Sequence, residues 1–209
     1  MGDVVAARRG EILAVMAHEA GKTVAEGDPE VSEAVDFARY YARSIATLER
    51  LAAEGAPSHP LGTVVVAPPW NFPFAIALGG VTAALAAGNS VILKPAPQAR
   101  RSARLVAECC WAAGVPVDAL QYVPTPDDEA GRRLITHPDV HAVILTGAHA
   151  TARMFLDWRP DLRLHAETSG KNAMVITAAA DLDLAIRDLV RSAFLHAGQK
   201  CSAASLAIV

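Results

Sequence analysis

The sequence has few cysteines, few aromatic residues and no long apolar run, and each shortage excludes a class of protein. Three cysteines in 209 residues, two of them adjacent at Cys109 and Cys110, exclude a disulfide framework and fit a reducing, cytoplasmic compartment. The cysteines and seven histidines lack the spacing of a metal site, so we expect no bound metal.

No apolar run approaches the roughly 20 residues that span a bilayer. The first residues also lack a signal-peptide pattern. A membrane is therefore not an expected partner.

The chain also has little excess charge of either sign. The net charge is −3, and no basic run is longer than a pair such as Arg100–Arg101. Because nucleic-acid binding needs a basic patch, nucleic acid is not an expected partner. The hydrophobic fraction of 52% is that of a globular chain, with room for one domain or for one domain and the beginning of another.

The first 60 residues predict helices. Apolar residues recur at helical spacing from residue 8 onward, and Gly21 is a suitable helix end. Asp28 is the expected N-cap of a second helix, with Pro29 in its first turn. Residues 55–60 are rich in turn formers. Residues 1–60 are therefore assigned to an N-terminal helical segment.

From residue 61 onward, short apolar runs alternate with helical patterns. Strands are expected at 63–67, 90–93, 121–123, 142–145, 163–166, 173–177 and 205–209, and helices at 75–87, 99–113, 128–136, 149–157 and 181–193. Continuous apolar strands separated by helices predict an α/β fold, a Rossmann-like doubly wound parallel sheet. Such sheets bind ligands beyond the carboxyl ends of their strands. The order of the strands is left open.

The glycine-rich phosphate loop of ordinary dinucleotide-binding folds is absent. The strand at 63–67 leads into PPWNFPF (68–74) where G-x-G-x-x-G would be expected, and no G-x-x-x-x-G-K-[ST] occurs. A nucleotide bound by this sheet would therefore be held by residues other than a glycine-rich loop.

Five motifs occur in a characteristic order. They are PPWNFPF (68–74), ILKPAP (92–97), ILTGA (144–148), ETSGK (167–171) and GQKCS (198–202). In order and approximate spacing they resemble the aldehyde dehydrogenase superfamily. Within it, the chain most resembles the glutamate-γ-semialdehyde (Δ1-pyrroline-5-carboxylate) dehydrogenases of proline breakdown. That closer resemblance is carried by EVSEAVDFARYYA (30–42), ETSGKNA (167–173) and AGQKCSA (197–203).

The resemblance covers essentially the whole chain and implies its domain organisation. Residues 61–195 would form the Rossmann-like NAD-binding domain, and residues 196–209 would begin the catalytic domain that carries the nucleophile. Relative to the family, the rest of that domain and the oligomerising regions are missing. The complete protein is expected to form a homo-oligomer.

The resemblance also implies three catalytic residues. Cys201 would be the nucleophile, because a thiolate forms a hydride-donating thiohemiacetal with an aldehyde and later leaves readily. The side-chain amide of Asn71 would stabilise the developing oxyanion. Glu167 would be the general base that activates water to hydrolyse the thioester. By contrast, Cys109 and Cys110 lie in an expected helix and are interpreted as inert, buried thiols.

The implied cofactor is NAD. NADP stays open, because Pro97 occupies a position where NAD-preferring members often carry Glu. Lys94 would reach the ribose hydroxyls, and Gly147 and Ala148 would place a helix N-terminus at the pyrophosphate. The commoner ELGGK is ETSGK here, which changes the wall beside the nicotinamide. The predicted cofactor-binding set is Val66, Ala67, Pro68, Trp70, Lys94, Ala96, Pro97, Gly147, Ala148, Thr168 and Ser169.

The implied substrate is a small aldehyde, glutamate γ-semialdehyde. Its ammonium group is expected to face Glu33, and Phe74, Lys200 and Ser202 complete the predicted substrate set. Two alternatives stay open. The first is a CoA-acylating aldehyde dehydrogenase, which shares the nucleophile but does not need Glu167 as a base. The second is a non-catalytic nucleotide-binding module, which would need neither the nucleophile nor the base. We expect little turnover from the isolated chain.

Overall fold

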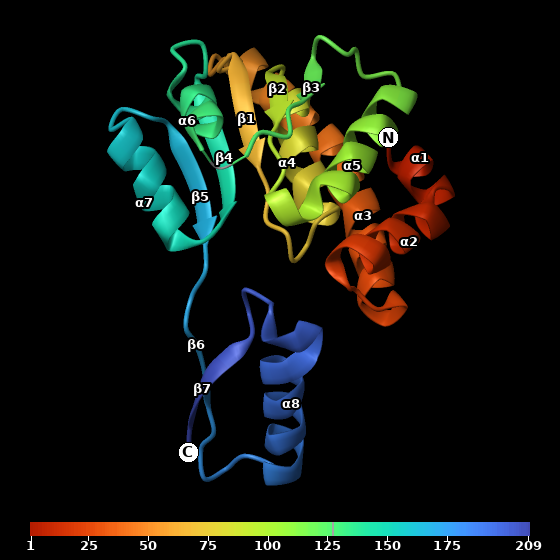
Figure 1. Cartoon of the computed structure of the whole chain (residues 1–209), viewed down its shortest axis with the longest axis vertical. Coiled ribbons are helices and arrows are strands. Elements are labelled where there is room, and N and C mark those ends of the chain that lie inside the picture. The colour runs from red at the N-terminus through yellow and green to blue at the C-terminus, as the bar shows by residue number, and fades with distance from the viewer. Residues whose placement is uncertain (127) are drawn as a thin grey trace. The chain divides into compact units, whose positions relative to one another are not determined.

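A computed structural model describes residues 1–126 and 128–209. It divides the chain into two compact units, Met1–Glu167 and Thr168–Val209, and each is described by itself. Figure 1 shows the elements of both. Within the described ranges, no helix is both long enough and apolar enough to cross a bilayer. The domain boundaries after residues 60 and 195 stay a prediction.

A five-stranded sheet forms the centre of the first unit (Figure 1). Its strands are β1 (Thr63–Ala67), β2 (Ser90–Leu93), β3 (Leu120–Tyr122), β4 (Ala142–Gly147) and β5 (Leu164–Thr168), in the order β3-β2-β1-β4-β5. The pairs β1–β2, β1–β4 and β2–β3 are parallel. The predicted doubly wound sheet is therefore confirmed. Its direction of winding reverses between β1 and β4, the point at which such sheets bind ligands.

The helices after β1 lie close to their predicted positions. They are α4 (Ala75–Ala86), the 3₁₀ turn η1 (Pro97–Ala99), α5 (Arg100–Ala112), α6 (Glu129–Thr136), α7 (His149–Trp158), α8 (Leu182–Phe194) and the 3₁₀ turn η2 (Leu195–Gly198). Asp128 and Asp181 cap α6 and α8, because their carboxylates accept from the backbone amides of Ala130 and Leu184.

Both faces of the sheet are covered, which explains why its strands are apolar at consecutive positions. Val64 and Val66 of β1 belong to one buried cluster with residues of α4 and α5. Val65 and Ala67 point to the opposite face and pack with residues of α6 and α7. Side chains alternate between the faces of a strand, so a strand that is buried on both sides needs no polar positions.

The N-terminal helical segment begins earlier than predicted and is divided differently. It consists of α1 (Gly2–Ala7), α2 (Arg9–Ala20) and α3 (Val24–Ala53). Gly21 ends α2 with a φ of 68°, in the left-handed region, as its position predicted.

The prediction that Asp28 caps the second helix is wrong. Thr23 is the N-cap of α3, and its side chain accepts from the backbone amide of Glu26. The Glu26 carboxylate in turn accepts from the Thr23 amide, which completes a capping box. Pro29 therefore lies inside α3, where it costs the helix one backbone hydrogen bond.

The second unit is a small α/β arrangement. Its two strands, β6 (Asn172–Val175) and β7 (Ala204–Ile208), pair in parallel, and α8 lies between them in sequence. Parallel strands need such a crossover connection. Both strands start one residue before their predicted positions.

Candidate active site

The segment PPWNFPF connects β1 to α4 and carries the predicted oxyanion residue. Asn71 is half-buried, and Trp70 is 38% exposed. Phe74 is fully buried and is the N-cap of α4, although its side chain cannot accept a hydrogen bond. Its predicted contact with substrate stays a prediction.

A buried ion pair supports this segment from the first helices. Glu30 of α3 is 1% exposed, and its carboxylate accepts from the ammonium of Lys22. The other Glu30 oxygen, Oε1, accepts from the backbone amides of Phe74, at 2.9 Å, and Ala75, at 3.1 Å. Glu30 is therefore the side-chain cap of α4. This cap was not predicted from the sequence, although a helix that begins after PPWNFPF has few polar side chains of its own that could cap it.

The Glu30 cap also accounts for the missing glycine motif. In ordinary dinucleotide-binding folds, the helix after the first strand receives the pyrophosphate at its N-terminus, and glycines allow the close approach. Here the carboxylate of Glu30 already takes the first amides of α4. A ligand phosphate would be repelled there, so the sequence needs no glycine-rich turn.

The helix after β4 has a different N-terminus. Gly147 ends β4 and Ala148 is the N-cap of α7, with no side-chain cap in the part of the chain that the structure describes. The pairing of Ala67 with Leu145 places the ends of β1 and β4 side by side. The amides of α7 therefore lie at the reversal point of the sheet, where they suit an anion.

Lys94 lies at the end of β2, next to β1. Its backbone amide donates to the carbonyl of Val66 at 2.9 Å, and the residue is only 6% exposed. Helix α6 packs closely here. A β-carbon at Gly131 would lie 2.6 Å from the Pro126 carbonyl oxygen and 3.6 Å from Cε of Lys94. The Pro126 carbonyl therefore leaves room only for a glycine at this position of α6, whereas Lys94 lies at an ordinary contact distance.

Among the other predicted residues of the first unit, Val66, Ala67 and Pro68 are buried, whereas the remaining ones are half-buried or exposed. Ala96 is half-buried and Pro97 exposed at the beginning of η1. Glu167 is exposed in β5, which is separated from β1 by β4. Glu33 is exposed on α3, one turn beyond Glu30 and on the same side of the helix.

Cys201 is exposed in a turn of the second unit. Lys200 and Ser202 on either side of it are exposed as well. The side chain of Asn172 supports the turn, because its Nδ2 donates to the carbonyls of Cys201, at 2.6 Å, and Ala203, at 3.1 Å. Asn172 lies within ETSGKNA, but this supporting role was not predicted from the sequence.

The chain enters this turn through strained backbone. His196 and Ala197 have φ values of 55° and 53°, in the left-handed region that non-glycine residues avoid. Each such residue costs on the order of 1–2 kcal/mol. Thr168, which ends β5, and Ser169 come shortly before Asn172. Because Cys201 and Asn71 belong to different units, a catalytic group formed by Cys201, Asn71 and Glu167 stays a prediction.

The other two cysteines are unsuitable as nucleophiles. Cys109 and Cys110 of α5 are both fully buried. Burial raises the pKa of the Cys109 thiol, although the guanidinium of Arg8 opposes it, and raises the pKa of Cys110 to about 12. Both thiols therefore stay protonated near neutral pH, and a protonated thiol is a poor nucleophile.

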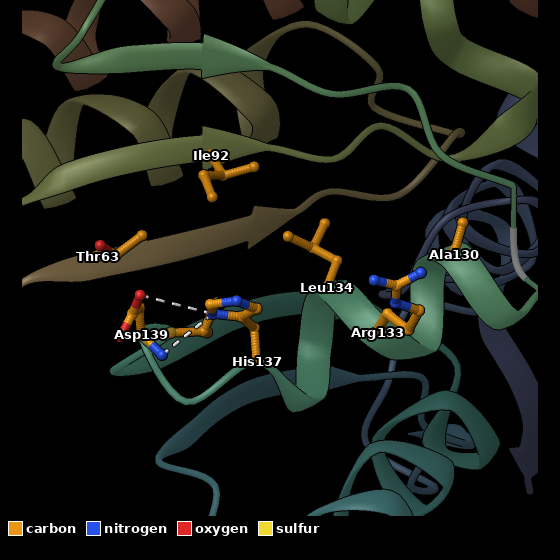
Figure 2. A pocket seen from close by; sticks show the side chains of 8 residues that line it. Thr63, Ile92, Ala130, Arg133, Leu134, His137 and Asp139 are labelled. Atoms are coloured by element: carbon orange, nitrogen blue, oxygen red, sulfur yellow. Dashed lines mark hydrogen bonds and ion pairs between the residues drawn. The ribbon is translucent and has the colours of Figure 1, made fainter.

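Two cavities in the described part of the first unit are lined by none of the predicted site residues. Figure 2 shows one of about 490 Å³ between the sheet and α6. It is lined by Thr63, Ile92, Ala130, Arg133, Leu134, His137, Asp139 and Val140. A second cavity, of about 410 Å³, has Phe37, Tyr41 and Ile76 among its lining residues. Across residues 1–126 and 128–209, no three His, Cys, Asp or Glu side chains gather in a way that could hold a metal ion.

Comparison with known proteins shows extensive similarity. A curated 1-pyrroline-5-carboxylate dehydrogenase of Staphylococcus epidermidis is 40% identical over 99% of this chain, which corresponds to 43% of that protein. The structure of Proline Utilization A from Corynebacterium freiburgense superposes with a TM-score of 0.91 and is 55% identical, over 99% of this chain and 21% of that one. A variant of 1-pyrroline-5-carboxylate dehydrogenase from Thermus thermophilus gives a TM-score of 0.91 at 35% identity, over 98% of this chain and 43% of that one.

The chain thus spans less than half the length of each of these relatives. The Aldehyde dehydrogenase family matches residues 1–209, which include all five motifs found in the sequence. With its sheet order, its β1–α4 segment and its exposed cysteine, the chain belongs to the aldehyde dehydrogenase family.

Proposed function

We propose that this chain contributes the cofactor-binding region and the nucleophile of an NAD-dependent dehydrogenase that oxidises glutamate γ-semialdehyde to glutamate. The observation that carries the proposal is the exposed Cys201 within GQKCS, in a chain of this family whose other two thiols are buried. The substrate is inferred from relatives named 1-pyrroline-5-carboxylate dehydrogenase.

In the proposed mechanism, the Cys201 thiolate attacks the aldehyde carbon and forms a carbon–sulfur bond. The carbonyl oxygen becomes an oxyanion, which accepts a hydrogen bond from the side-chain amide of Asn71. NAD, when bound, would supply the hydride acceptor. As the C–H bond of the thiohemiacetal breaks and the hydride leaves, the carbonyl re-forms and a thioester remains on Cys201. Glu167 then takes a proton from water, the resulting hydroxide attacks the thioester carbon, and the carbon–sulfur bond breaks to release glutamate.

The residues of the first unit fit a dinucleotide. The amides at the N-terminus of α7 suit the pyrophosphate, and Lys94, at the end of β2 on the other side of β1, suits the ribose hydroxyls. Pro97 has no carboxylate to repel a 2′-phosphate.

Calorimetric titration of the chain with NAD and with NADP tests the proposed binding of the cofactor. We expect saturable binding of NAD, which Ala148→Glu should abolish because it places a negative charge beside the pyrophosphate.

Thiol labelling tests the nucleophile. At pH 8, iodoacetamide should modify Cys201 alone in the folded chain, whereas all three cysteines should react after unfolding. Peptide mass spectrometry distinguishes the sites. Labelling of Cys109 or Cys110 at the rate of Cys201 in the folded chain would contradict the proposal, as would an inaccessible Cys201.

We also expect the isolated 209-residue chain to have little or no turnover, because the chain spans less than half of its relatives. Steady-state NADH formation from glutamate semialdehyde at the rate of a complete enzyme would refute this expectation. In an active complete protein, release of glutamate without CoA favours hydrolysis with Glu167 as base. Release that depends on CoA would indicate an acylating enzyme instead.

A further inference from the structure

We propose that Lys22 is a positioning residue for Asn71 and that Glu30 holds Lys22 in place. This inference rests on the proposed oxyanion role of Asn71. It assigns a function to the one buried ion pair that touches the β1–α4 segment in the part of the chain that the structure describes.

The ammonium of Lys22 contacts two consecutive residues of that segment. It donates to the backbone carbonyl of Asn71 at 3.1 Å, and it lies 4.0 Å from the ring centre of Phe72. Its remaining partner is the Glu30 carboxylate. Because Lys22 is only 8% exposed, water has little access to compete for these contacts. A buried, charge-assisted hydrogen bond is stronger than a neutral one.

The segment has little capacity to hold itself. Prolines at positions 68, 69 and 73 supply no backbone N–H, so they cannot donate hydrogen bonds within the turn. The carbonyl of Asn71 therefore takes its donor from outside, from Lys22 between α2 and α3. A fixed carbonyl restricts the backbone of Asn71 and thus the direction in which its side chain leaves the chain.

Stability alone is a weak reason for such a pair. Replacing a buried ion pair with neutral groups of similar volume is often neutral or stabilising. A neutral pair could fill the same space, but an apolar side chain at position 22 could not donate to the Asn71 carbonyl. The geometry therefore points to orientation as the role of Lys22.

The two functions of the pair can be separated by substitution. In the double variant Lys22→Met/Glu30→Gln, the Gln Oε1 can still accept from Phe74 and Ala75, so α4 keeps its cap. The charges and the hydrogen bond to Asn71 are lost together, and no unpaired buried charge is left. We expect the melting temperature to stay within about 4 °C of the unsubstituted chain, which corresponds to roughly 1 kcal/mol for a protein of this size.

The decisive measurement is ¹⁵N relaxation of the Asn71 side-chain amide in the 209-residue chain. We expect this amide to be rigid in the unsubstituted chain and clearly more mobile in the double variant. The side-chain amide of Asn89 is the internal control, because it donates to the Ala84 carbonyl and does not touch the pair. A double variant with an unchanged Asn71 amide would overturn the proposal.

If the double variant does not fold, Glu30→Gln alone provides the test. It keeps Lys22 and both amide bonds but removes the carboxylate that orients the ammonium. An unchanged Asn71 amide in that variant would overturn the role of Glu30. Because neither measurement needs turnover, an Asn71→Ala enzyme that kept its kcat would refute the proposed function and leave this result standing.

Discussion

The environment of each cysteine decides what its thiol can do. Cys109 and Cys110 of α5 lie in the buried cluster on one face of the sheet. Cys201, by contrast, lies in an exposed turn supported by Asn172. The chemical difference comes from solvation, because a thiolate is stabilised by water and destabilised by apolar surroundings. Sequence patterns alone could suggest this division, since the first two cysteines occupy helical positions and the third a polar loop.

Burial of Cys110 makes the first unit sensitive to alkaline pH. Its pKa is about 12 in the folded chain and near the ordinary value of 9.0 when unfolded. Below about pH 9 both states are protonated, and the thiol has no effect on the pH dependence. Between about 9 and about 12 only the unfolded state loses the proton, so stability should fall by about 1.4 kcal/mol per pH unit. Cys109 should act in the same direction.

Urea unfolding at about pH 8 and about pH 10 measures this effect. The matched variant is Cys110→Ala, which should be less stable at pH 8 because a buried group is removed, but should show a shallower decline toward pH 10. Equal declines for the two chains would show that ionisation of Cys110 is not coupled to folding.

At the scale of elements, the close approach of the Pro126 carbonyl to α6 accounts for Gly131. In Gly131→Ala, the added β-carbon would meet the Pro126 carbonyl oxygen at 2.6 Å, a distance that requires the backbone to shift. We expect a loss of about 1–3 kcal/mol in the free energy of unfolding.

A glycine in α2 supplies the control for this substitution. A β-carbon at Gly10 would meet nothing within 4 Å, so Gly10→Ala should gain about 0.5–1 kcal/mol from helix propensity. Denaturant unfolding of both variants compares an open position with a crowded one. If Gly131→Ala were as well tolerated as Gly10→Ala, α6 would not be tightly packed at this point.

The elements also show which helix end is open to an anion. Helix α4 is capped by Glu30 from a distant part of the chain, whereas α7 begins at Ala148, which has no side chain that could accept. Two helices that follow adjacent strands, on opposite faces of the sheet, therefore differ at their N-termini. The turn after β4, where the phosphate site was predicted, therefore suits an anion better than the first strand–helix turn does.

At the scale of the whole molecule, the two units differ in the depth of their cores. The first unit contains two buried clusters, one on each face of the sheet. Of residues 168–209, by contrast, none is buried in the structure as described, and the unit has only α8, a short 3₁₀ turn and two strands. A segment of this size with so little buried apolar surface is expected to be marginally stable.

We therefore expect limited proteolysis to cut within residues 168–209 before any site in β1, β2 or β4. Mass spectrometry of the early products should show an intact fragment close to Met1–Glu167, the boundary between the units. A ligand that joins the units would slow the first cut. Initial cleavage within the sheet of the first unit would contradict this order.

Much of the fold could be predicted from the sequence because its signals are local. Apolar strands and helical spacing are properties of short segments, and the positions predicted from them were correct within a few residues. The error at Asp28 was also local. Thr23 and Glu26 form a capping box that outweighs the cost of Pro29 inside the helix.

By itself, the sequence determined the fold class, the five motifs and the family, because each depends on the identity and spacing of neighbouring residues. Only the tertiary structure decided the order of the strands, the cap that Glu30 gives α4, and the contact of Lys22 with Asn71. The physical reason is that hydrogen bonds between residues far apart in the chain depend on how helices and strands pack. The sequence around such a donor or acceptor does not indicate which distant residue it will bind.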